Sequence, residues 1–372
     1  MGNSPRYQWK RILVPFSWIY GLVVWIRNKL YDSGLLKSTE FNMPVISVGN
    51  ITIGGTGKTP HTEYLAELLK KEFRVATLSR GYRRESRDFR IATLQSTVPE
   101  LGDEPLQMKK KYPDVVVAVD RKRVHGISEL MKLVPTVDVV LLDDAFQHRS
   151  LKPGFSILLI DYMRPIQKDH LLPAGMLREP ARNRNRANII LVTRTPESIK
   201  PIELREYVNR IRRSMGQHLY FTTMRYGDLS PVFPNVEWRE AAWFKKQVGG
   251  ILVVSGIANP HSLRQYALGL HTNIVELPFP DHHDYTQKDL MKIHQTFREM
   301  RRKEEEILVL TTEKDAMRLR DHHPEPELRD AMYAVRIEVH FLNEDKDEFD
   351  RQILNYVSSN KRSSILHQGE DS

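Results

Sequence analysis

Residues 44–59 read Pro-Val-Ile-Ser-Val-Gly-Asn-Ile-Thr-Ile-Gly-Gly-Thr-Gly-Lys-Thr, an apolar β-branched run that leads into a glycine-rich turn. Glycines allow successive backbone N–H groups to turn onto phosphate oxygens, and the N-terminus of a following helix adds positive potential. Lysine at the end of such a loop reaches the terminal phosphates, and the next hydroxyl can bind Mg²⁺. We therefore expect a strand, a phosphate-binding loop and a helix, with nucleotide contacts from Gly54, Gly55, Thr56, Gly57, Lys58 and Thr59.

The fit to the phosphate-loop pattern is imperfect, because Thr52 stands where the first glycine is usual. The alternative is a glycine-rich structural turn followed by an ordinary lysine. The strand pattern before the turn and the helical pattern after it favour nucleotide binding.

Composition narrows the class of protein. The 372 residues are 40% hydrophobic and 28% charged, which suits one large or two ordinary globular domains. The formal net charge of +9 favours an anionic partner: nucleic acid, acidic lipid or a phosphorylated substrate. The chain has no cysteine, which excludes disulfides, thiolate catalysis and cysteine-bound metal. Any metal must therefore bind through oxygen or histidine.

The first thirty residues contain five basic side chains and no acid. Between Arg11 and Arg27 lie only uncharged residues, among them Trp18, Tyr20 and Trp25. This run is shorter than the about 20 residues that span a bilayer, and its basic ends and aromatic residues predict a helix lying in one leaflet. A buried core helix is the main alternative. A signal peptide is disfavoured because no small-residue cleavage site follows.

Short apolar runs rich in valine and isoleucine follow a first predicted helix at 59–71, and they predict buried parallel strands. They lie at 74–79, 114–119, 138–142, 155–160 and 188–193, before a helix at 201–214 and a strand at 218–223. After a polar, irregular stretch at 224–250, a second set is expected: strands at 251–255, 306–311 and 333–341, and helices near 261–269, 286–302 and 347–357.

The predicted fold class is α/β, a parallel sheet of the P-loop NTPase type with a second, smaller α/β domain and a membrane-associated N-terminal helix. The predicted divisions are the interfacial helix at 1–30, the nucleotide-binding core at 31–223 and the smaller domain at 224–372. The late strand of the smaller domain is a candidate to return to the core.

Two adjacent carboxylates end the strand predicted at 138–142. The run Val139 to Asp144 has the form of a Walker B motif, and the carboxyl end of a parallel strand faces the ligand. Either Asp143 or Asp144 is therefore expected to hold Mg²⁺, and His148 follows in a polar cluster. The alternative is an aspartate pair that caps the next helix.

A second carboxylate motif, Gly102-Asp103-Glu104-Pro105, stands in a loop. Asp103 could accept a proton from an acceptor hydroxyl, as a kinase base does, but locally the motif also suits a helix N-terminus. The segment 279–286 contains His282, for which we favour a catalytic or phosphate-binding role over a metal site.

Two further segments carry groups that suit anionic ligands. The loop at 172–180 contains Arg178 and precedes several arginines, whose forks match phosphate; a solvated surface is the alternative. Glu313, Lys314 and Asp315 close the strand at 306–311, where ligand-facing groups collect.

These segments together resemble one family. Val-Gly-Asn with Gly-Gly-Thr-Gly-Lys-Thr-Pro, Ser-Arg-Gly-Tyr, Gly-Asp-Glu-Pro, Asp-Asp-Ala-Phe-Gln-His-Arg, Leu-Arg-Glu-Pro, Pro-Asp-His and Thr-Glu-Lys-Asp occur in the order found in tetraacyldisaccharide 4′-kinases of lipid A synthesis. The resemblance spans roughly residues 10–320. Two positions depart from the pattern: Ala145 and Arg83 stand where glycine is usual.

The resemblance implies transfer of the ATP γ-phosphate to the 4′-hydroxyl of tetraacyldisaccharide 1-phosphate, at the cytoplasmic face of the inner membrane. It implies ATP and Mg²⁺ as cofactors, with no nucleic acid and no obligate protein partner. Asp103 paired with His282 would be the base, and Lys58 and Asp144 would take part in catalysis. Thr59, Asp143, Asp144 and His148 would form the metal site. ATP would also contact Glu313, Lys314 and Asp315, and the substrate would contact Arg178, Glu104 and Arg121.

The rival from another class is a regulatory ATPase switch of the partitioning type that binds DNA or a membrane. Such switches carry a lysine before the glycine pair, where this chain has Ile53. A nucleic-acid-binding ATPase is also disfavoured, because the aromatic residues cluster at the N-terminus and not among the arginines.

Overall fold

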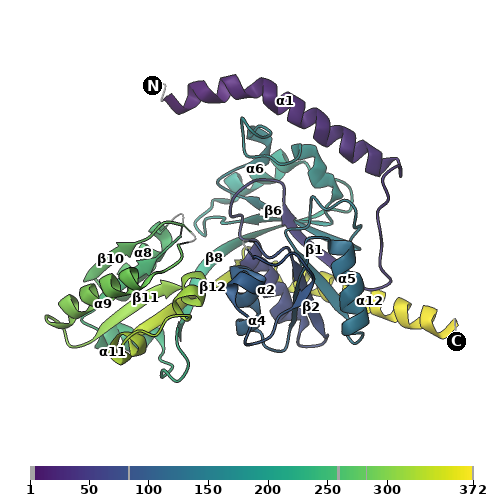
Figure 1. Cartoon of the computed structure of the whole chain (residues 1–372). Coiled ribbons are helices and arrows are strands. Elements are labelled where there is room, and N and C mark those ends of the chain that lie inside the picture. Colours follow the sequence, from purple (N-terminus) through teal and green to yellow (C-terminus); the bar gives the residue numbers. More distant parts are fainter. Residues whose placement is uncertain (1–4, 83, 258–259, 282, 371–372) are drawn as a thin grey trace. The chain divides into compact units, whose positions relative to one another are not determined.

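The computed structural model describes residues 5–82, 84–257, 260–281 and 283–370, with side chains from 12 to 361 inside those ranges (Figure 1). The chain forms two compact units. Unit 1 contains Met1–Leu101, Met108–Met224 and Val339–Ser372, and unit 2 contains Gly102–Gln107 and Arg225–Glu338.

Unit 1 is built on a mostly parallel sheet in the order β8-β7-β6-β1-β5-β2-β4-β3. Its strands are β1 (Val45–Asn50), β2 (Val75–Ser79), β3 (Arg90–Ile91), β4 (Val116–Val119), β5 (Val139–Asp143), β6 (Phe155–Asp161), β7 (Ile189–Thr193) and β8 (His218–Pro231). Strand β3 pairs antiparallel with β4. The central strand β1 lies between β5 and β6, and Val48 is in register with Asp143. The carboxyl ends of β1 and β5 are therefore neighbours.

Helices and short 3₁₀ turns accompany these strands (Figure 1). They are α1 (Pro5–Asp32), α2 (Lys58–Leu69), α3 (Val98–Leu101), α4 (Asp103–Lys111), α5 (Arg123–Leu133), α6 (Pro201–Ile211) and α12 (Lys346–Glu370), with 3₁₀ turns η1 (Ile166–Lys168) and η2 (Ala181–Arg186). Helix α2 starts directly after Gly57, and Pro60 stands in its first turn, where no backbone donor is needed. The strands are buried on both faces, which explains their continuous apolar sequences.

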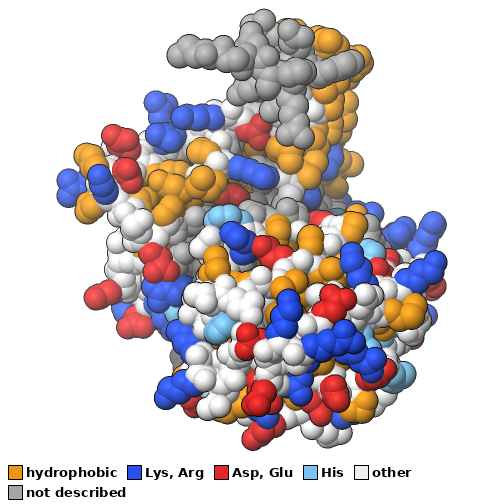
Figure 2. Space-filling model, turned by 90° about the vertical axis from the view of Figure 1, so that its left-hand side faces the viewer, with side chains coloured by type: hydrophobic (Ala, Val, Ile, Leu, Met, Phe, Trp, Pro, Cys, Tyr) orange, Lys and Arg blue, Asp and Glu red, His pale blue; other side chains and the backbone are white. Residues whose placement is uncertain are grey.

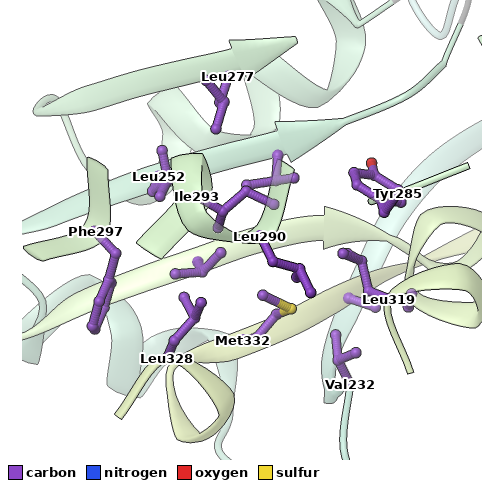
Figure 3. Packing of buried hydrophobic residues seen from close by; sticks show 14 of the residues in the cluster. Val232, Leu252, Leu277, Tyr285, Leu290, Ile293, Phe297, Leu319, Leu328 and Met332 are labelled. Atoms are coloured by element: carbon purple, nitrogen blue, oxygen red, sulfur yellow. The ribbon is translucent and has the colours of Figure 1, made fainter. Parts of the chain in front are cut away.

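Unit 2 has a smaller parallel sheet, formed by β10 (Ile274–Pro278), β9 (Gly250–Ser255), β11 (Ile307–Thr312) and β12 (Met332–Phe341) in that order. Its helices are α7 (Ala241–Gln247), α8 (His261–Leu270), α9 (Gln287–Arg301), α10 (Glu313–Leu319) and α11 (Pro326–Asp330). Figure 3 shows one face of its core, where Leu290, Ile293 and Phe297 of α9 pack with Leu252 and Met332.

The structure differs from the sequence-based expectation in several elements. Strand β8 continues to Pro231, so the predicted end at residue 223 is wrong, and part of the predicted irregular stretch is α7. Strands β3 and β10 were not predicted; β3 has two residues, and β10 is partly exposed without a continuous apolar run.

The units meet in sequence at Met224 and Arg225, one residue after the predicted boundary at residue 223, and two further segments change units. Residues Val339–Ser372 group with unit 1, so the chain returns to the first unit after the late strand begins. The short segment Gly102–Gln107 groups with unit 2, although it lies far upstream. Strands β8 and β12 each contribute residues to both units.

Candidate functional site

The phosphate loop between β1 and α2 is shaped by internal hydrogen bonds. Asn50, the last residue of β1, donates through Nδ2 to the Thr56 hydroxyl (2.8 Å) and to the Gly54 carbonyl (3.4 Å). The Thr193 hydroxyl donates to the Thr56 carbonyl (2.9 Å). Gly54 (φ 103°) and Gly57 (φ 84°) adopt left-handed backbone conformations that glycine favours. These hydrogen bonds and backbone angles give the predicted loop a defined shape.

His61 supports this loop from within α2. Its Nδ1 lies 2.7 Å from the Gly57 carbonyl, and its Nε2 lies 2.9 Å from the Thr222 hydroxyl. A carbonyl only accepts, so Nδ1 carries the proton and Nε2 accepts from Thr222. Burial lowers the pKa of His61 to about 4, and the imidazole is therefore neutral at pH 7.

We expect the buried His61 to make stability fall in acid. The usual histidine pKa is about 6.5, so between pH 6.5 and 4 the unfolded chain binds a proton that the folded chain does not. The free energy of unfolding then falls as pH is lowered through this window, by an amount on the order of 3 kcal/mol for this group. Urea unfolding measured from pH 7.5 to 4.5 checks this. His61→Gln should flatten the dependence, and His218→Gln, a surface control on β8, should not; equal slopes in all three proteins would contradict the assignment.

The carboxylate pair stands beside the phosphate loop. Asp143 ends β5, and Asp144 follows in a left-handed conformation (φ 50°). Asp144 Oδ1 lies 3.7 Å from Lys58 Nζ, and Arg178 Nη1 lies 3.3 Å from both carboxylate oxygens of Asp144. Burial raises the pKa of Asp144, but the charges of Lys58 and Arg178 outweigh burial and leave this pKa below its usual value. The carboxylate is therefore ionised.

The turn after Asp144 explains why one departure from the family pattern is tolerated. The left-handed residue in this turn is Asp144 and not Ala145, so alanine meets no backbone strain there. The position in this region that requires glycine is Gly49 of β1, because a Cβ there would lie 2.7 Å from the Cβ of Phe146. The other departure, Arg83, lies outside the described residues.

A cavity of about 420 Å³ opens next to Asp144. Basic side chains and the N-terminal helix contribute to its lining, which consists of Tyr20, Val24, Arg27, Ile53, Arg80, Arg123, Asp144, Gln147, His148, Leu172 and Arg178. Arg123 is buried and donates to the carbonyls of Asp120 (2.6 Å) and Asp143 (3.1 Å). Burial lowers the pKa of His148 to about 4, with the charge of Arg123 acting in the same direction. The cavity combines cationic and apolar surfaces.

Two arginines that were not predicted as site residues, Arg80 and Arg123, line this cavity. Arg121 is exposed and does not line it, and the predicted substrate contact of Arg121 stays a prediction. A short basic run in a loop does not reveal which side chain points inward, so no sequence signal separated Arg121 from Arg123.

Asp103 lies in unit 2, at the start of α4. Its carboxylate pairs with the Arg318 guanidinium: Nε donates to Oδ1 (3.2 Å), and Nη2 donates to Oδ2. Arg318 Nη1 also donates to the His283 carbonyl (3.1 Å). The predicted partner of Asp103, His282, lies outside the described residues, so that pairing stays a prediction.

The segment Glu313–Asp315 begins α10 in unit 2. Asp315 is buried, accepts from the Gly256 amide (3.0 Å) and the Thr312 hydroxyl (2.8 Å), and has a pKa raised by burial. Glu313 lies 4.0 Å from Arg336 Nε. Asp315 therefore links the start of α10 to the residue that follows β9 through these hydrogen bonds. The contacts proposed for ATP with Glu313, Lys314 and Asp315 stay predictions.

Across the described residues, no group of three or more histidine and acidic side chains is arranged to hold a metal ion. The predicted magnesium ligands are His148, the Thr59 hydroxyl in the first turn of α2 and the Asp143–Asp144 pair, and this metal site stays a prediction. The oxygen donors of this set suit Mg²⁺, which keeps several waters and takes few protein ligands. Glu104 is half-buried in unit 2, and its predicted contact with the substrate stays a prediction.

Comparison with known proteins gives a consistent result. A family model described as tetraacyldisaccharide-1-P 4′-kinase matches residues 9–358. The tetraacyldisaccharide 4′-kinase of Bacteroides thetaiotaomicron is 47% identical over 369 residues, covering 96% of each chain. The enzyme of the same name from Flavobacterium johnsoniae is 41% identical over 351 residues, covering 94% of this chain and 98% of the relative.

Among solved structures, the chain is similar to LpxK from Aquifex aeolicus, an "apo" form crystallised in complex with ATP. The TM-score is 0.73 at 30% identity, and the match covers 94% of this chain and 99% of that chain.

Proposed function

The chain belongs to the tetraacyldisaccharide-1-P 4′-kinase family, and from that premise we propose that it transfers the γ-phosphate of ATP to the 4′-hydroxyl of tetraacyldisaccharide 1-phosphate. The product would be lipid IVA, a late intermediate of lipid A synthesis. The observation that carries the proposal is the arrangement in unit 1: a shaped phosphate loop, Lys58 beside Asp144, and an adjoining cavity with arginines and apolar side chains.

Each part of this arrangement suits one part of the reactants. Backbone donors of the phosphate loop and Lys58 would bind the ATP phosphates, and Lys58 would neutralise charge that develops on the transferred group. Thr59 with Asp143 or Asp144 would hold Mg²⁺, which would neutralise negative charge on the phosphates. His148, neutral at pH 7, would act beside this site as a hydrogen-bonding group. Arg178 and its neighbours would contact an anionic substrate.

Asp103 is the proposed base that accepts the proton of the 4′-hydroxyl. It is a buried carboxylate on unit 2, held by a cation, and the neighbouring loop at 281–286 contains His282. A carboxylate paired with histidine can share the proton as the hydroxyl attacks.

The N-terminal helix supports membrane association. The side of α1 that faces the rest of unit 1 is formed by Ser17, Val24 and Asn28, each less than 9% exposed. The Ser17 hydroxyl donates to the Leu171 carbonyl (2.9 Å), and the Tyr20 hydroxyl donates to the Arg178 carbonyl (2.9 Å). The inward side is thus narrow and largely polar.

The outward side of α1 is apolar. Eight large hydrophobic side chains are 43–72% exposed there: Ile12, Phe16, Trp18, Ile19, Leu22, Val23, Trp25 and Ile26. Figure 2 shows hydrophobic side chains gathered at the upper right of its view. A core helix would bury such residues, and an exposed patch of this kind marks an interaction surface. No helix in the described part of the chain is long and apolar enough to cross a membrane. We therefore propose that α1 lies in one leaflet, at the cytoplasmic face of the inner membrane.

Removing two tryptophans from this surface should weaken membrane binding without disturbing the nucleotide site. Trp18 is 72% exposed and Trp25 43% exposed, so replacing them by glutamine costs the folded chain little. Loss of each apolar side chain should lower vesicle partitioning on the order of tenfold and raise KM for the lipid more than KM for ATP. Vesicle co-sedimentation and steady-state kinetics measure both. Trp238→Gln, at a 55% exposed tryptophan of unit 2, is the control; equal effects from both variants would refute the anchor.

The reaction class is tested with labelled ATP and three samples: tetraacyldisaccharide 1-phosphate, duplex DNA, and no acceptor. We expect label in the lipid alone. Release of inorganic phosphate that DNA stimulates and lipid does not would favour the partitioning-type ATPase instead.

A further inference from the structure

Arg318 joins two segments of unit 2 that the proposed chemistry depends on. Its guanidinium makes two parallel bonds to the Asp103 carboxylate, through Nε (3.2 Å to Oδ1) and Nη2. The side chains are 5% and 9% exposed, so water competes little for either partner. A fork of this kind fixes the rotation of a carboxylate, which a point charge cannot do.

The remaining nitrogen of the fork holds the histidine-containing loop. Arg318 Nη1 donates to the His283 carbonyl (3.1 Å), which is the backbone group next to His282 in sequence. On its other side the loop is fixed as well, because His283 Nε2 donates to Asp289 (3.0 Å) and the His283 ring stacks on Phe279 at 4.9 Å. One guanidinium therefore links the proposed base to the loop of its proposed partner.

The burial of the Asp103–Arg318 pair needs a physical explanation. The charged groups around Arg318 are Asp103, Asp315 and Asp284, so acidic side chains surround this cation. A buried ion pair is weak evidence of a contribution to stability, because desolvation offsets much of the attraction. A role in orientation explains a buried fork better than stability alone does.

We propose that Arg318 is a positioning residue that orients Asp103 and the 281–286 loop for proton abstraction from the acceptor hydroxyl. This inference rests on the proposed function, in which Asp103 is the base. Arg318 does not touch the reacting atoms; it acts through Asp103. Its loss should lower kcat on the order of 10- to 100-fold, as misplacement of a reacting group does, with KM for ATP nearly unchanged.

The test compares Arg318→Lys, Arg318→Met and Arg318→Ala in the full-length enzyme on vesicles that contain the lipid acceptor. Lysine keeps the positive charge but lacks the paired donors of the guanidinium. Methionine keeps a similar side-chain length but has neither the charge nor the donors. Arg320→Met is the matched control, because Arg320 is also partly buried and lies one residue past α10 but donates to the Val232 carbonyl. Millimolar guanidinium chloride, far below denaturing concentrations, is added to Arg318→Ala to restore the missing fork.

We expect all three Arg318 variants to lose kcat with intact KM for ATP, guanidinium to restore part of the kcat of Arg318→Ala, and Arg320→Met to match the parent. Folding is checked by thermal melting of each variant. If Arg318→Lys and Arg318→Met melt like the parent and turn over within twofold of it while Asp103→Asn is inactive, the positioning role is wrong and the base stands. If Asp103→Asn retains activity, the proposed base fails, and the role of Arg318 fails with it.

Discussion

Lys58→Ala should lower kcat on the order of 100-fold or more, while ATP affinity falls much less. Lys58 stands at the start of α2, is 17% exposed, and lies 3.7 Å from Asp144. Its charge stabilises the transferred group most strongly in the transition state, whereas backbone donors of the loop still bind the nucleotide in the ground state. The loss therefore appears in kcat.

The measurement is kcat at saturating ATP and lipid, together with ATP affinity by calorimetry. Lys70→Ala is the control, because Lys70 follows the same helix and its contacts are an exposed ion pair with Asp114 (3.4 Å) and a cation–π contact with Tyr112 (5.1 Å), not groups of the phosphate loop. Near-parental turnover of Lys58→Ala would mean that residues 54–59 are a structural turn and not a phosphate site.

Asp103→Asn should lower kcat by about 10²- to 10⁴-fold, the range that general-base catalysis contributes. Asparagine keeps the shape of the side chain but cannot accept the proton. It also leaves Arg318 with a neutral partner in a buried site, so thermal melting must accompany the kinetics. Asp114→Asn, at an exposed carboxylate after α4, is the control.

The paired role predicts a specific pattern with His282. If Asp103 and His282 act as one unit, Asp103→Asn and His282→Ala together should be little worse than either alone. Losses that add in full would separate the two residues, and Asp103 would then act with Arg318 alone or only as part of the helix N-terminus.

Much of the fold was predictable because buried parallel strands have a local signature. Val, Ile and Leu runs located β1, β2 and β4 to β7 to within a residue or two, because both faces of these strands are buried. Strand β10 has no such run, since only Leu277 of its five residues is buried, while two are partly buried and two are exposed. The long course of β8 was missed because its second half alternates with polar residues, as a half-exposed strand does.

The candidate site residues could be predicted where a local sequence motif contains them, as with Lys58 and Asp144. They could not be predicted where the site depends on contacts between segments that are distant in sequence. Arg318 lies 215 positions from Asp103, and no local pattern connects them. Local sequence alone favoured a helix N-terminus at Asp103, and Asp103 does begin α4; the fold adds the ion pair. His61 and Arg123 carry no motif either, because burial and hydrogen bonds to other segments give each its role.

Phosphorus–proton correlation NMR of the reaction product tests whether the enzyme phosphorylates one hydroxyl of one lipid. The purified enzyme, ATP, Mg²⁺ and tetraacyldisaccharide 1-phosphate are incubated on vesicles, and the lipid product is extracted. We expect the 1-phosphate to remain and a second phosphorus to correlate with the proton on carbon 4′ of the disaccharide. A second phosphorus at another carbon, or ATP converted only to ADP and inorganic phosphate, would contradict the account.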